Sequence, residues 1–217
     1  MIEDVQNYLN EIRRDFMKQS LSENDVEKSP FDQFAKWFEE AVNSQILDPY
    51  AMTVSTVDNN CKPSSRVVYL RDISENGLIF YTNYLSRKGH DIEVHPYISV
   101  NIYWAELERQ IRIEGTVNKA PKEKSDEYFA KRPRESQIGA WASEQSSVIE
   151  SRTVLEERVK YFTEKFKDKP VPRPQHWGGY IIKPYYFEYW QGRPNRLHDR
   201  IVYVLENNQW KIKRLAP

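Results

Sequence analysis

The sequence predicts a mostly β protein, an antiparallel barrel with peripheral α-helices. Segments rich in Val, Ile and Tyr, separated by Asn, Asp and Gly, dominate the middle and the C-terminal part of the chain. Helical periodicity is confined to segments inserted around them, and no regular alternation of strand and helix favours a doubly wound parallel sheet. We expect a single domain over residues 1–217, with an N-terminal helical segment (1–45) and a C-terminal strand region (175–217).

The helices are expected from apolar residues at helical spacing and from capping residues. Such spacing predicts an amphipathic helix over residues 4–17, followed by a polar loop at 20–28. Ser29 and Pro30 suit the N-cap and first position of a second helix with Phe31, Phe34, Phe38 and Ala41 on its buried stripe. Further helices are expected over 86–94, over 122–131 and from about 147 onwards, where Ser147 and Glu150 resemble a capping box.

The strands are expected from alternating or β-branched runs bounded by turn residues. Their ranges are 51–57, 65–71, 78–82, 98–104, 110–117, 179–183, 185–190, 201–205 and 209–215. Ile111 and Ile113 alternate with polar neighbours, which is typical of a half-buried antiparallel strand. The proline-rich stretch 169–174 is expected to be a stiff linker.

Charge and composition exclude several classes of partner and site. Lys+Arg and Asp+Glu both number 32, and this zero net charge disfavours nucleic acid, whose binding depends on a summed positive field. A single cysteine, Cys61, allows no internal disulfide, and no metal-ligand spacing is present. The acidic N-terminus does not resemble a signal peptide and no apolar run reaches membrane-spanning length, so we expect a cytoplasmic protein.

Two segments in the first half of the chain place positive charge where an anion would stabilise it. Arg66 shares a strand face with two apolar residues, which is unusual for a solvent-facing side. Arg87 and Lys88 open a helix, where the helix dipole disfavours cations unless an anion such as phosphate is bound nearby. For both segments, side chains that simply reach into water are the alternative interpretation.

Two later segments extend the pattern. Tyr128 and Arg132 are one helical turn apart, and Ser136 follows, so the three could converge on a phosphate monoester, although a solvated helix end is an alternative. Residues 190–200 link two strands and combine Trp190, three arginines and His198, a side chain able to transfer protons near neutral pH. A charged hairpin loop is the alternative there. Together the four segments indicate two anion sites and a planar ligand, while motifs for Rossmann dinucleotide binding, zinc hydrolysis and serine hydrolysis are missing.

Residues 132–141 (RPRESQIGAW), 187–192 (FEYWQG) and 196–200 (RLHDR) closely resemble the signature of the pyridoxamine 5′-phosphate oxidase family. The resemblance covers nearly the whole chain. It implies an FMN-binding split β-barrel that forms a homodimer with FMN in clefts between the subunits. It also implies oxidation of pyridoxamine or pyridoxine 5′-phosphate to pyridoxal 5′-phosphate, with O2 as acceptor and H2O2 as product, and with ammonia released from the amine.

Site residues follow from the resemblance, position by position. The FMN-binding residues would be Arg66, Val67, Val68, Tyr69, Leu70, Arg71, Tyr81, Thr82, Arg87, Lys88 and Gln110, together with Gln145, Ser146, Trp190 and Arg200, the last four from the second subunit. The substrate phosphate would be held by Arg71, Tyr128, Arg132 and Ser136. Arg196 and His198 would be catalytic and lie over the pyridine ring beside Leu197, under a lid formed by Arg13, Arg14, Asp15 and Phe16.

Two positions depart from the expected family pattern. Arg71 stands where lysine is expected, which keeps the charge but changes its reach and geometry. Phe16 stands where tyrosine is expected, so a hydroxyl is lost. Two other function classes stay open: a flavin-binding split-barrel reductase with another donor, and a non-enzymatic β-barrel that binds single-stranded nucleic acid.

Overall fold

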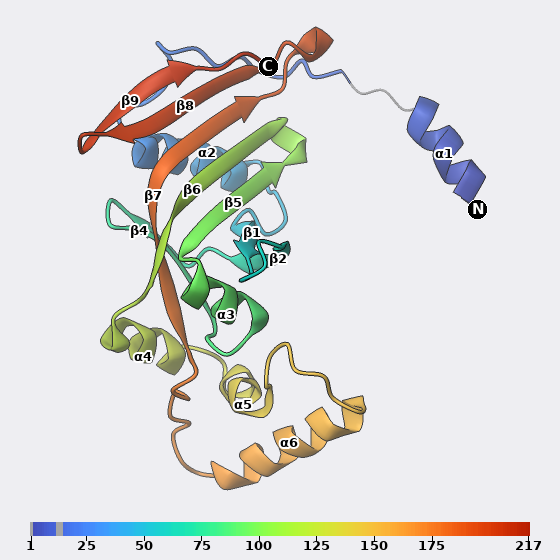
Figure 1. The fold of residues 1–217 in the computed structure, drawn as a ribbon, viewed down its shortest axis with the longest axis vertical. Coiled ribbons are helices and arrows are strands. Elements are labelled where there is room, and N and C mark those ends of the chain that lie inside the picture. The colour runs from blue at the N-terminus through green and yellow to red at the C-terminus, as the bar shows by residue number, and fades with distance from the viewer. Residues whose placement is uncertain (1, 12–14) are drawn as a thin grey trace. The chain divides into compact units, whose positions relative to one another are not determined.

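The structure is a computed structural model that describes residues 2–11 and 15–217 (Figure 1). The chain divides into two compact units. Unit 1 contains the described parts of Met1–Leu47, together with Tyr103–Ile111 and Phe187–Pro217. Unit 2 contains Asp48–Ile102 and Arg112–Tyr186. The single domain expected from the sequence stays a prediction.

The predicted antiparallel sheet is confirmed and contains nine strands in the described residues. Its hydrogen-bonded order is β2-β1-β5-β6-β7-β4-β3, with β8 on β7 and β9 on β8. The strands are β1 (Ala51–Val57), β2 (Pro63–Tyr69), β3 (Asp72–Ser74), β4 (Gly77–Asn83), β5 (Tyr97–Trp104), β6 (Arg109–Lys119), β7 (Trp177–Gln191), β8 (Asp199–Glu206) and β9 (Gln209–Arg214). Strands β6 and β7 each contribute to both units.

The pattern of burial along the strands explains β1, β6 and β2. In β1 every second side chain is buried, and Met52 and Val54 are almost inaccessible to solvent. Ile111 and Ile113 of β6 are fully buried, as the alternation in the sequence predicted. The edge strand β2 buries no side chain fully, and its Val67 and Tyr69 are exposed.

Unit 1 packs helix α2 (Pro30–Asn43) against aromatic residues of β7. Ser29 caps this helix as predicted, because its hydroxyl accepts a hydrogen bond from the Phe31 amide. Trp37, which the predicted apolar stripe missed, meets Tyr189 edge-to-face at 5.1 Å. The Tyr189 hydroxyl donates to the Pro30 carbonyl at 2.6 Å, so a buried polar group is satisfied at the start of the helix.

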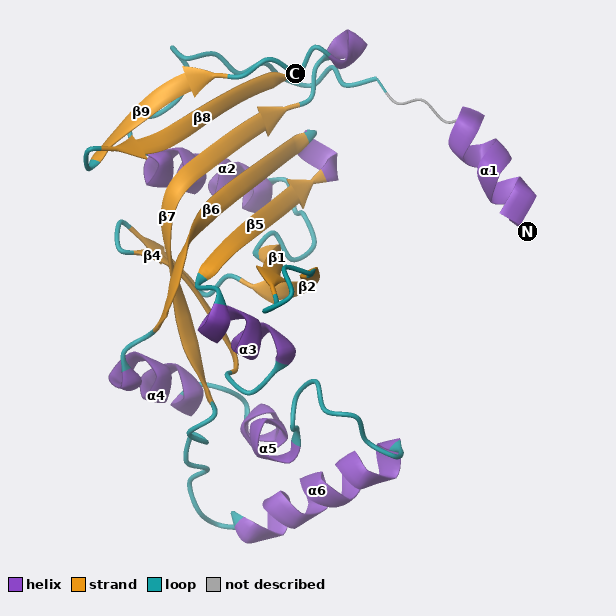
Figure 2. Ribbon diagram, in the orientation of Figure 1, coloured by secondary structure: helices purple, strands orange, loops and turns teal. Residues whose placement is uncertain are grey.

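Four helices accompany the sheet of unit 2 (Figure 2). They are α3 (Arg87–Val94), α4 (Lys122–Ala130), α5 (Arg134–Ala142) and α6 (Arg152–Lys165). The last three gather near the Trp177 end of β7, where Phe129, Ile138, Phe166 and Trp177 form a small apolar core. No helix in the described part of the chain combines the length and the apolar character needed to cross a membrane.

Several element boundaries differ from the predictions. Helix α1 (Ile2–Glu11) is shorter than the expected 4–17, and residues 15–17 lie outside it. Helix α6 begins at Arg152 rather than near 147, and Val148, which precedes it, is fully exposed. The two strands expected on either side of Pro184 are one strand, β7. Proline has no N–H to donate, but the pairing of β7 with β4 already ends at Ile182, so Pro184 does not interrupt that pairing. Helix α5 and strand β3 were not predicted.

Candidate active site

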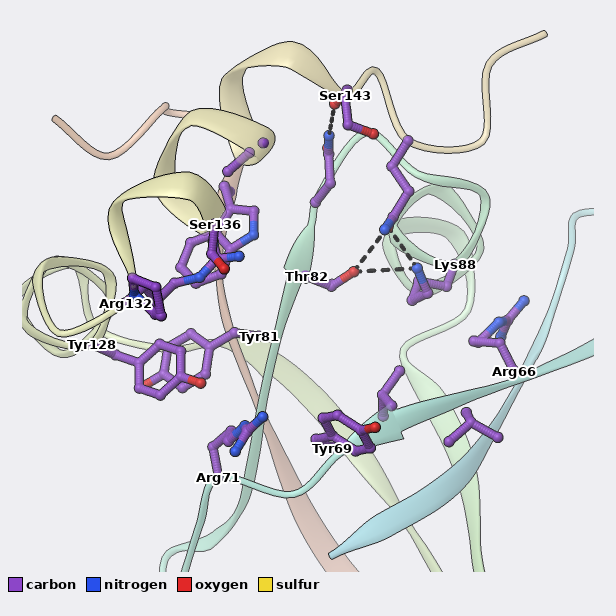
Figure 3. A pocket seen from close by; sticks show the side chains of 18 residues that line it. Arg66, Tyr69, Arg71, Tyr81, Thr82, Lys88, Tyr128, Arg132, Ser136 and Ser143 are labelled. Carbon is purple, nitrogen blue, oxygen red and sulfur yellow. Dashed lines mark hydrogen bonds between the residues drawn. The ribbon is translucent and has the colours of Figure 1, made fainter. Parts of the chain in front are cut away.

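A cavity of about 710 Å³ lies within unit 2, in the size range of small-molecule sites. It opens beside the edge strand β2, the C-terminal half of β4, and the helices α3, α4 and α5 (Figure 3). The predicted site residues that line it are Arg66, Val67, Val68, Tyr69, Arg71, Tyr81, Thr82, Lys88, Tyr128, Arg132, Ser136 and Gln145. The sequence thus identified most of the lining from segments far apart in the chain. Gln145, which was expected to act from the second subunit, lies here beside residues of its own chain.

Lys88 lies at one end of this cavity, near the N-terminus of α3. Its ammonium donates to Thr82 Oγ1 at 3.2 Å (Figure 3) and to Gln145 Oε1 at 2.8 Å. It also donates to the Ser86 hydroxyl at 3.2 Å. Ser86 also caps α3 by accepting from the Gly89 amide. A side chain at position 89 would collide with the Tyr84 carbonyl, so the close first turn of α3 requires glycine.

Arg66 reaches the same end of the cavity from β2. Its guanidinium donates to Thr56 Oγ1 at 2.7 Å and to the Ser64 hydroxyl at 2.5 Å, and it lies 4.0 Å from the buried Asp91 carboxylate. Asp91 in turn accepts from Thr56 at 2.6 Å. The arginine is therefore fixed in a polar network before any ligand arrives.

The electrostatics of this end favour an anion. Burial and, after it, the charge of Arg66 lower the pKa of Lys88 from 10.5 to about 8, against the opposing effect of Asp91. Burial likewise lowers the pKa of Arg66, and the charge of Arg87 adds to this effect while Asp91 opposes it. Cations held close together and away from water are stabilised when a ligand supplies negative charge. We name Arg66 and Lys88 the network pair.

A second pair of cations, Arg71 and Arg132, lies elsewhere in the cavity, on the side of Tyr81 and Tyr128 (Figure 3). Arg132 Nη1 is buried and has no hydrogen-bond partner among the described residues. Burial lowers the pKa of Arg132, and the charge of Arg71 lowers it further, with Tyr128 acting in the opposite direction. A buried donor that faces a like charge is costly unless an anion completes it.

Aromatic faces hold these two arginines. The Arg132 guanidinium lies 4.5 Å from the centre of the Trp177 ring, and that of Arg71 lies 5.1 Å from the centre of the Tyr69 ring. Tyr81 and Tyr128 stack on one another at 3.8 Å with nearly parallel rings, and Trp177 continues the stack at 5.6 Å from Tyr81. We name Arg71 and Arg132 the aromatic pair. Trp177 was not predicted as a site residue, although its position at the start of a strand among prolines could have drawn attention to it.

A further group of predicted residues lies in unit 1, at the end of β7 and in the loop between β7 and β8. Trp190 and His198 have ring centres 4.6 Å apart, and Phe16 meets both rings edge-to-face at 5.6 and 5.4 Å. Arg196 adopts a left-handed backbone conformation and is exposed, as is Leu197. Burial and the charge of Arg196 lower the pKa of His198.

The remaining predicted residues are placed as follows. Leu70 is buried, and Arg87 is exposed at the start of α3, and neither lines the cavity. Ser146 has a left-handed backbone beside Gln145 but is also outside the lining. Gln110 and Arg200 belong to unit 1, where Arg200 pairs with Glu188 at 2.7 Å. Asp15 is exposed, and Arg13 and Arg14 lie outside the described residues. Among the described residues, no group of His, Cys, Asp and Glu is arranged to hold a metal ion.

Comparison with known families gives two matches that together span most of the chain. Residues 38–166 match the family described as pyridoxamine 5′-phosphate oxidase. Residues 177–217 match the pyridoxine 5′-phosphate oxidase C-terminal dimerisation region.

Curated relatives are similar over nearly their whole length. A pyridoxine/pyridoxamine 5′-phosphate oxidase of Mannheimia succiniciproducens is 50% identical over 209 residues, covering 96% of this chain and 99% of the relative. The protein of the same name from Cyanothece sp. is 47% identical and covers 96% of this chain and 98% of its own.

Solved structures show the same architecture. PhzG from Burkholderia lata 383, in complex with tetrahydrophenazine-1-carboxylic acid, matches with a TM-score of 0.86 at 27% identity over 92% of this chain and 98% of its own. A pyridoxamine 5′-phosphate oxidase-related, FMN binding protein from Nostoc punctiforme matches with a TM-score of 0.70 at 15% identity, over 88% of this chain and 100% of its own. The second similarity concerns the fold alone, and it confirms the predicted split-barrel class.

Proposed function

Because the chain belongs to the pyridoxamine 5′-phosphate oxidase family and is an oxidoreductase, we propose that it converts pyridoxamine and pyridoxine 5′-phosphate to pyridoxal 5′-phosphate with FMN as cofactor. Bound FMN would supply the two-electron acceptor, which O2 reoxidises to give H2O2. The amine substrate would release ammonia on hydrolysis, and the alcohol would give the aldehyde directly. The observation that carries the proposal is the presence of two separate cation pairs in one cavity.

The network pair suits the phosphate of FMN. Lys88 and Arg66 are already oriented by hydrogen bonds, and the free amides at the N-terminus of α3 lie beside them. Thr82 and Gln145 join the same network at 3.1 Å. These residues would bind the cofactor and fix its position, and the low pKa of Lys88 would rise when the phosphate neutralises the site.

The aromatic pair suits the phosphate of the substrate. Arg132 has a buried N–H donor without a partner among the described residues, and Arg71, Tyr128 and Ser136 line the same region. A phosphate monoester offers the oxygen acceptors that such donors require. Anchoring the phosphate at a distance from the reacting carbon would orient C4′ without taking part in the chemistry.

The unit 1 group suits recognition of the pyridine ring, and we propose that Arg196 and His198 act there, from the second subunit of a homodimer. The match of residues 177–217 to a dimerisation region supports this arrangement. The Arg193 amide donates to His198 Nδ1 at 3.1 Å, so the neutral ring carries its proton on Nε2. In this tautomer His198 would donate a hydrogen bond to the C4′ substituent, which favours a positioning role over that of a proton acceptor.

The proposal is tested by purifying the protein, identifying any released flavin and following oxygen uptake. We expect a yellow protein that contains FMN and consumes O2 with both phosphorylated vitamers. Pyridoxine without its phosphate should be turned over at least about 100-fold less efficiently, because the charge-assisted contacts to phosphate are lost. A colourless protein that does not take up FMN would contradict the proposal.

The similarity to PhzG raises a second candidate, oxidation of an unphosphorylated heteroaromatic carboxylate. A carboxylate could also pair with Arg132. The same oxygen-uptake assay separates the two functions, since a phenazine-type substrate would then be consumed while the vitamin B6 esters would not. The 47–50% identity to named pyridoxine/pyridoxamine 5′-phosphate oxidases supports the first candidate.

A further inference from the structure

Arg71 is enclosed by two tyrosines, Tyr50 from the turn directly before β1 and Tyr69 from the end of β2. Its guanidinium carbon lies 5.4 Å from the centre of the Tyr50 ring and 5.1 Å from the centre of the Tyr69 ring. The two rings meet edge-to-face at 5.0 Å. The antiparallel register of β1 and β2 pairs Ala51 with Tyr69 and so brings Tyr50 alongside. Both rings are therefore positioned by the backbone of the sheet.

Asp48 fixes the far ends of both rings. The Tyr50 hydroxyl donates to Asp48 Oδ1 at 2.6 Å, and the Tyr69 hydroxyl donates to Oδ2 at 3.3 Å. Asp48 itself adopts a left-handed backbone conformation, and its carbonyl accepts from the Ala51 amide at 2.8 Å. One carboxylate at a turn thus orients two aromatic faces toward one cation.

The tyrosines hold Arg71 without consuming its donors. In the part of the chain that the structure describes, no residue accepts a hydrogen bond from the Arg71 side chain, whereas its backbone amide donates to Ile79. A cation held through ring faces keeps its N–H groups for a ligand. Guanidinium is planar and stacks on aromatic rings better than ammonium does, so this enclosure suits arginine rather than lysine.

We propose that Asp48, Tyr50 and Tyr69 form a positioning cage that holds the planar fork of Arg71 ready for a phosphate monoester, and so sets the affinity for phosphorylated substrate. The proposal rests on the function proposed above. It assigns Tyr50 and Asp48, which do not line the cavity, a role through Arg71. Pre-orientation removes part of the entropy cost of ordering a long side chain when the substrate binds.

The cleanest variant is Tyr50→Leu in the FMN-loaded enzyme, because Tyr50 does not touch the cavity. We expect KM for pyridoxine 5′-phosphate to rise about 3- to 10-fold, the range of a single cation–π contact, with kcat and FMN content unchanged. Tyr50→Phe keeps the ring and loses only the bond to Asp48, so its KM should rise less. Tyr161→Leu, a tyrosine 60% exposed on α6, is the matched control and should leave KM unchanged.

A double-mutant cycle separates positioning from general damage. In an Arg71→Met background the cage has no cation to hold, so adding Tyr50→Leu should change KM no further. An equal rise of KM in both backgrounds, or no rise with Arg71 present, would overturn the cage while leaving the proposed function intact. If the enzyme proves inactive toward B6 esters, the proposed function fails, and calorimetric titration with inorganic phosphate still decides. Tyr50→Leu must then weaken phosphate binding only when Arg71 is present, and any other result rejects the cage.

Discussion

The two cation pairs of the cavity are held in different ways. In the network pair, Arg66 and Lys88 donate hydrogen bonds to hydroxyl and amide oxygens of the protein. In the aromatic pair, Arg71 and Arg132 lie against the faces of Tyr69 and Trp177, and Arg132 Nη1 has no partner among the described residues. Cations fixed by hydrogen bonds already have acceptors for some of their N–H donors. Cations fixed against aromatic rings keep their N–H donors available for a ligand.

This difference fits two ligands with different residence times. A cofactor that stays bound can be held by a preformed network, which loses little order on binding. A substrate that must enter and leave at each turnover is better served by donors that no protein group competes for. The following predictions test whether the two pairs are independent in this sense.

The largest effect is expected from Arg132→Ala. Removing this guanidinium takes away the buried donor that has no protein partner, so kcat/KM for pyridoxine 5′-phosphate should fall about 100-fold or more. FMN affinity should stay within about threefold, because the network pair is untouched. Steady-state oxygen uptake and flavin titration measure the two quantities. Lys131→Ala, at an exposed neighbouring position paired with Glu127, is the control. A large loss of FMN affinity in Arg132→Ala would show that the two cation pairs do not bind independent ligands.

The converse change, Lys88→Met, should weaken FMN binding about 10- to 100-fold, since a charged hydrogen-bond donor is lost. At saturating FMN the KM for substrate should be unchanged. The apoprotein should be as stable as the original or more stable, because a buried charge is replaced by an apolar side chain of similar length. Fluorescence titration and thermal unfolding test both parts, with Lys122→Met, an exposed lysine, as control. A destabilised apoprotein would mean that Lys88 mainly supports the fold.

The pH dependence should follow the pKa of Lys88, which burial and Arg66 lower from 10.5 to about 8. FMN phosphate prefers the charged lysine, so FMN affinity should decline as pH rises through about 8, by up to about tenfold per pH unit. The stability of the apoprotein should change with pH in the opposite direction to the FMN affinity. Between about 8 and 10.5 the unfolded chain binds more protons than the folded one, so this group contributes increasing stability as pH rises.

Both trends should vanish in Lys88→Met, and flavin titrations and thermal unfolding between pH 7 and 10 would reveal them. An FMN affinity that is flat across this interval in the unaltered protein would remove Lys88 from the cofactor site.

The smallest effect is expected at His198, whose Nδ1 already accepts a hydrogen bond from the Arg193 amide. His198→Gln can still place a donor near the position of Nε2, so its kcat should exceed that of His198→Ala by about 2- to 10-fold, the value of one neutral hydrogen bond. Oxygen uptake at pH 7 measures this difference. Equal rates for the two variants would argue against donation from Nε2.

The sequence predicted the strands better than the helix ends. Alternation and β-branched residues defined β1 to the residue, since one buried face leaves only one register for the pattern. The predicted start of α6 was wrong: Ser147 and Glu150 look like a capping box, yet residues 144–151 are exposed, Val148 fully so, and the helix begins only at Arg152. Helix α5 was not predicted because it follows a proline, Pro133. The structure has this proline at the N-cap, where no intrahelical hydrogen bond is lost through its missing N–H.

The sequence by itself determined the β architecture and a charge balance that disfavours polyanions, because these depend on periodicity and composition. Residue type and spacing also singled out Arg66, Lys88 and Arg132, whereas most other cavity-lining side chains followed only from the resemblance to the family. Only the tertiary structure decided that Arg66 lies near Lys88 and Arg71 near Arg132. It also decided that oxygen atoms hold the first two cations, that aromatic rings hold the other two, and that Asp48 anchors two tyrosines. Such pairings join residues from different strands and helices. Their geometry depends on sheet register and on burial, which no local pattern of amino acids encodes.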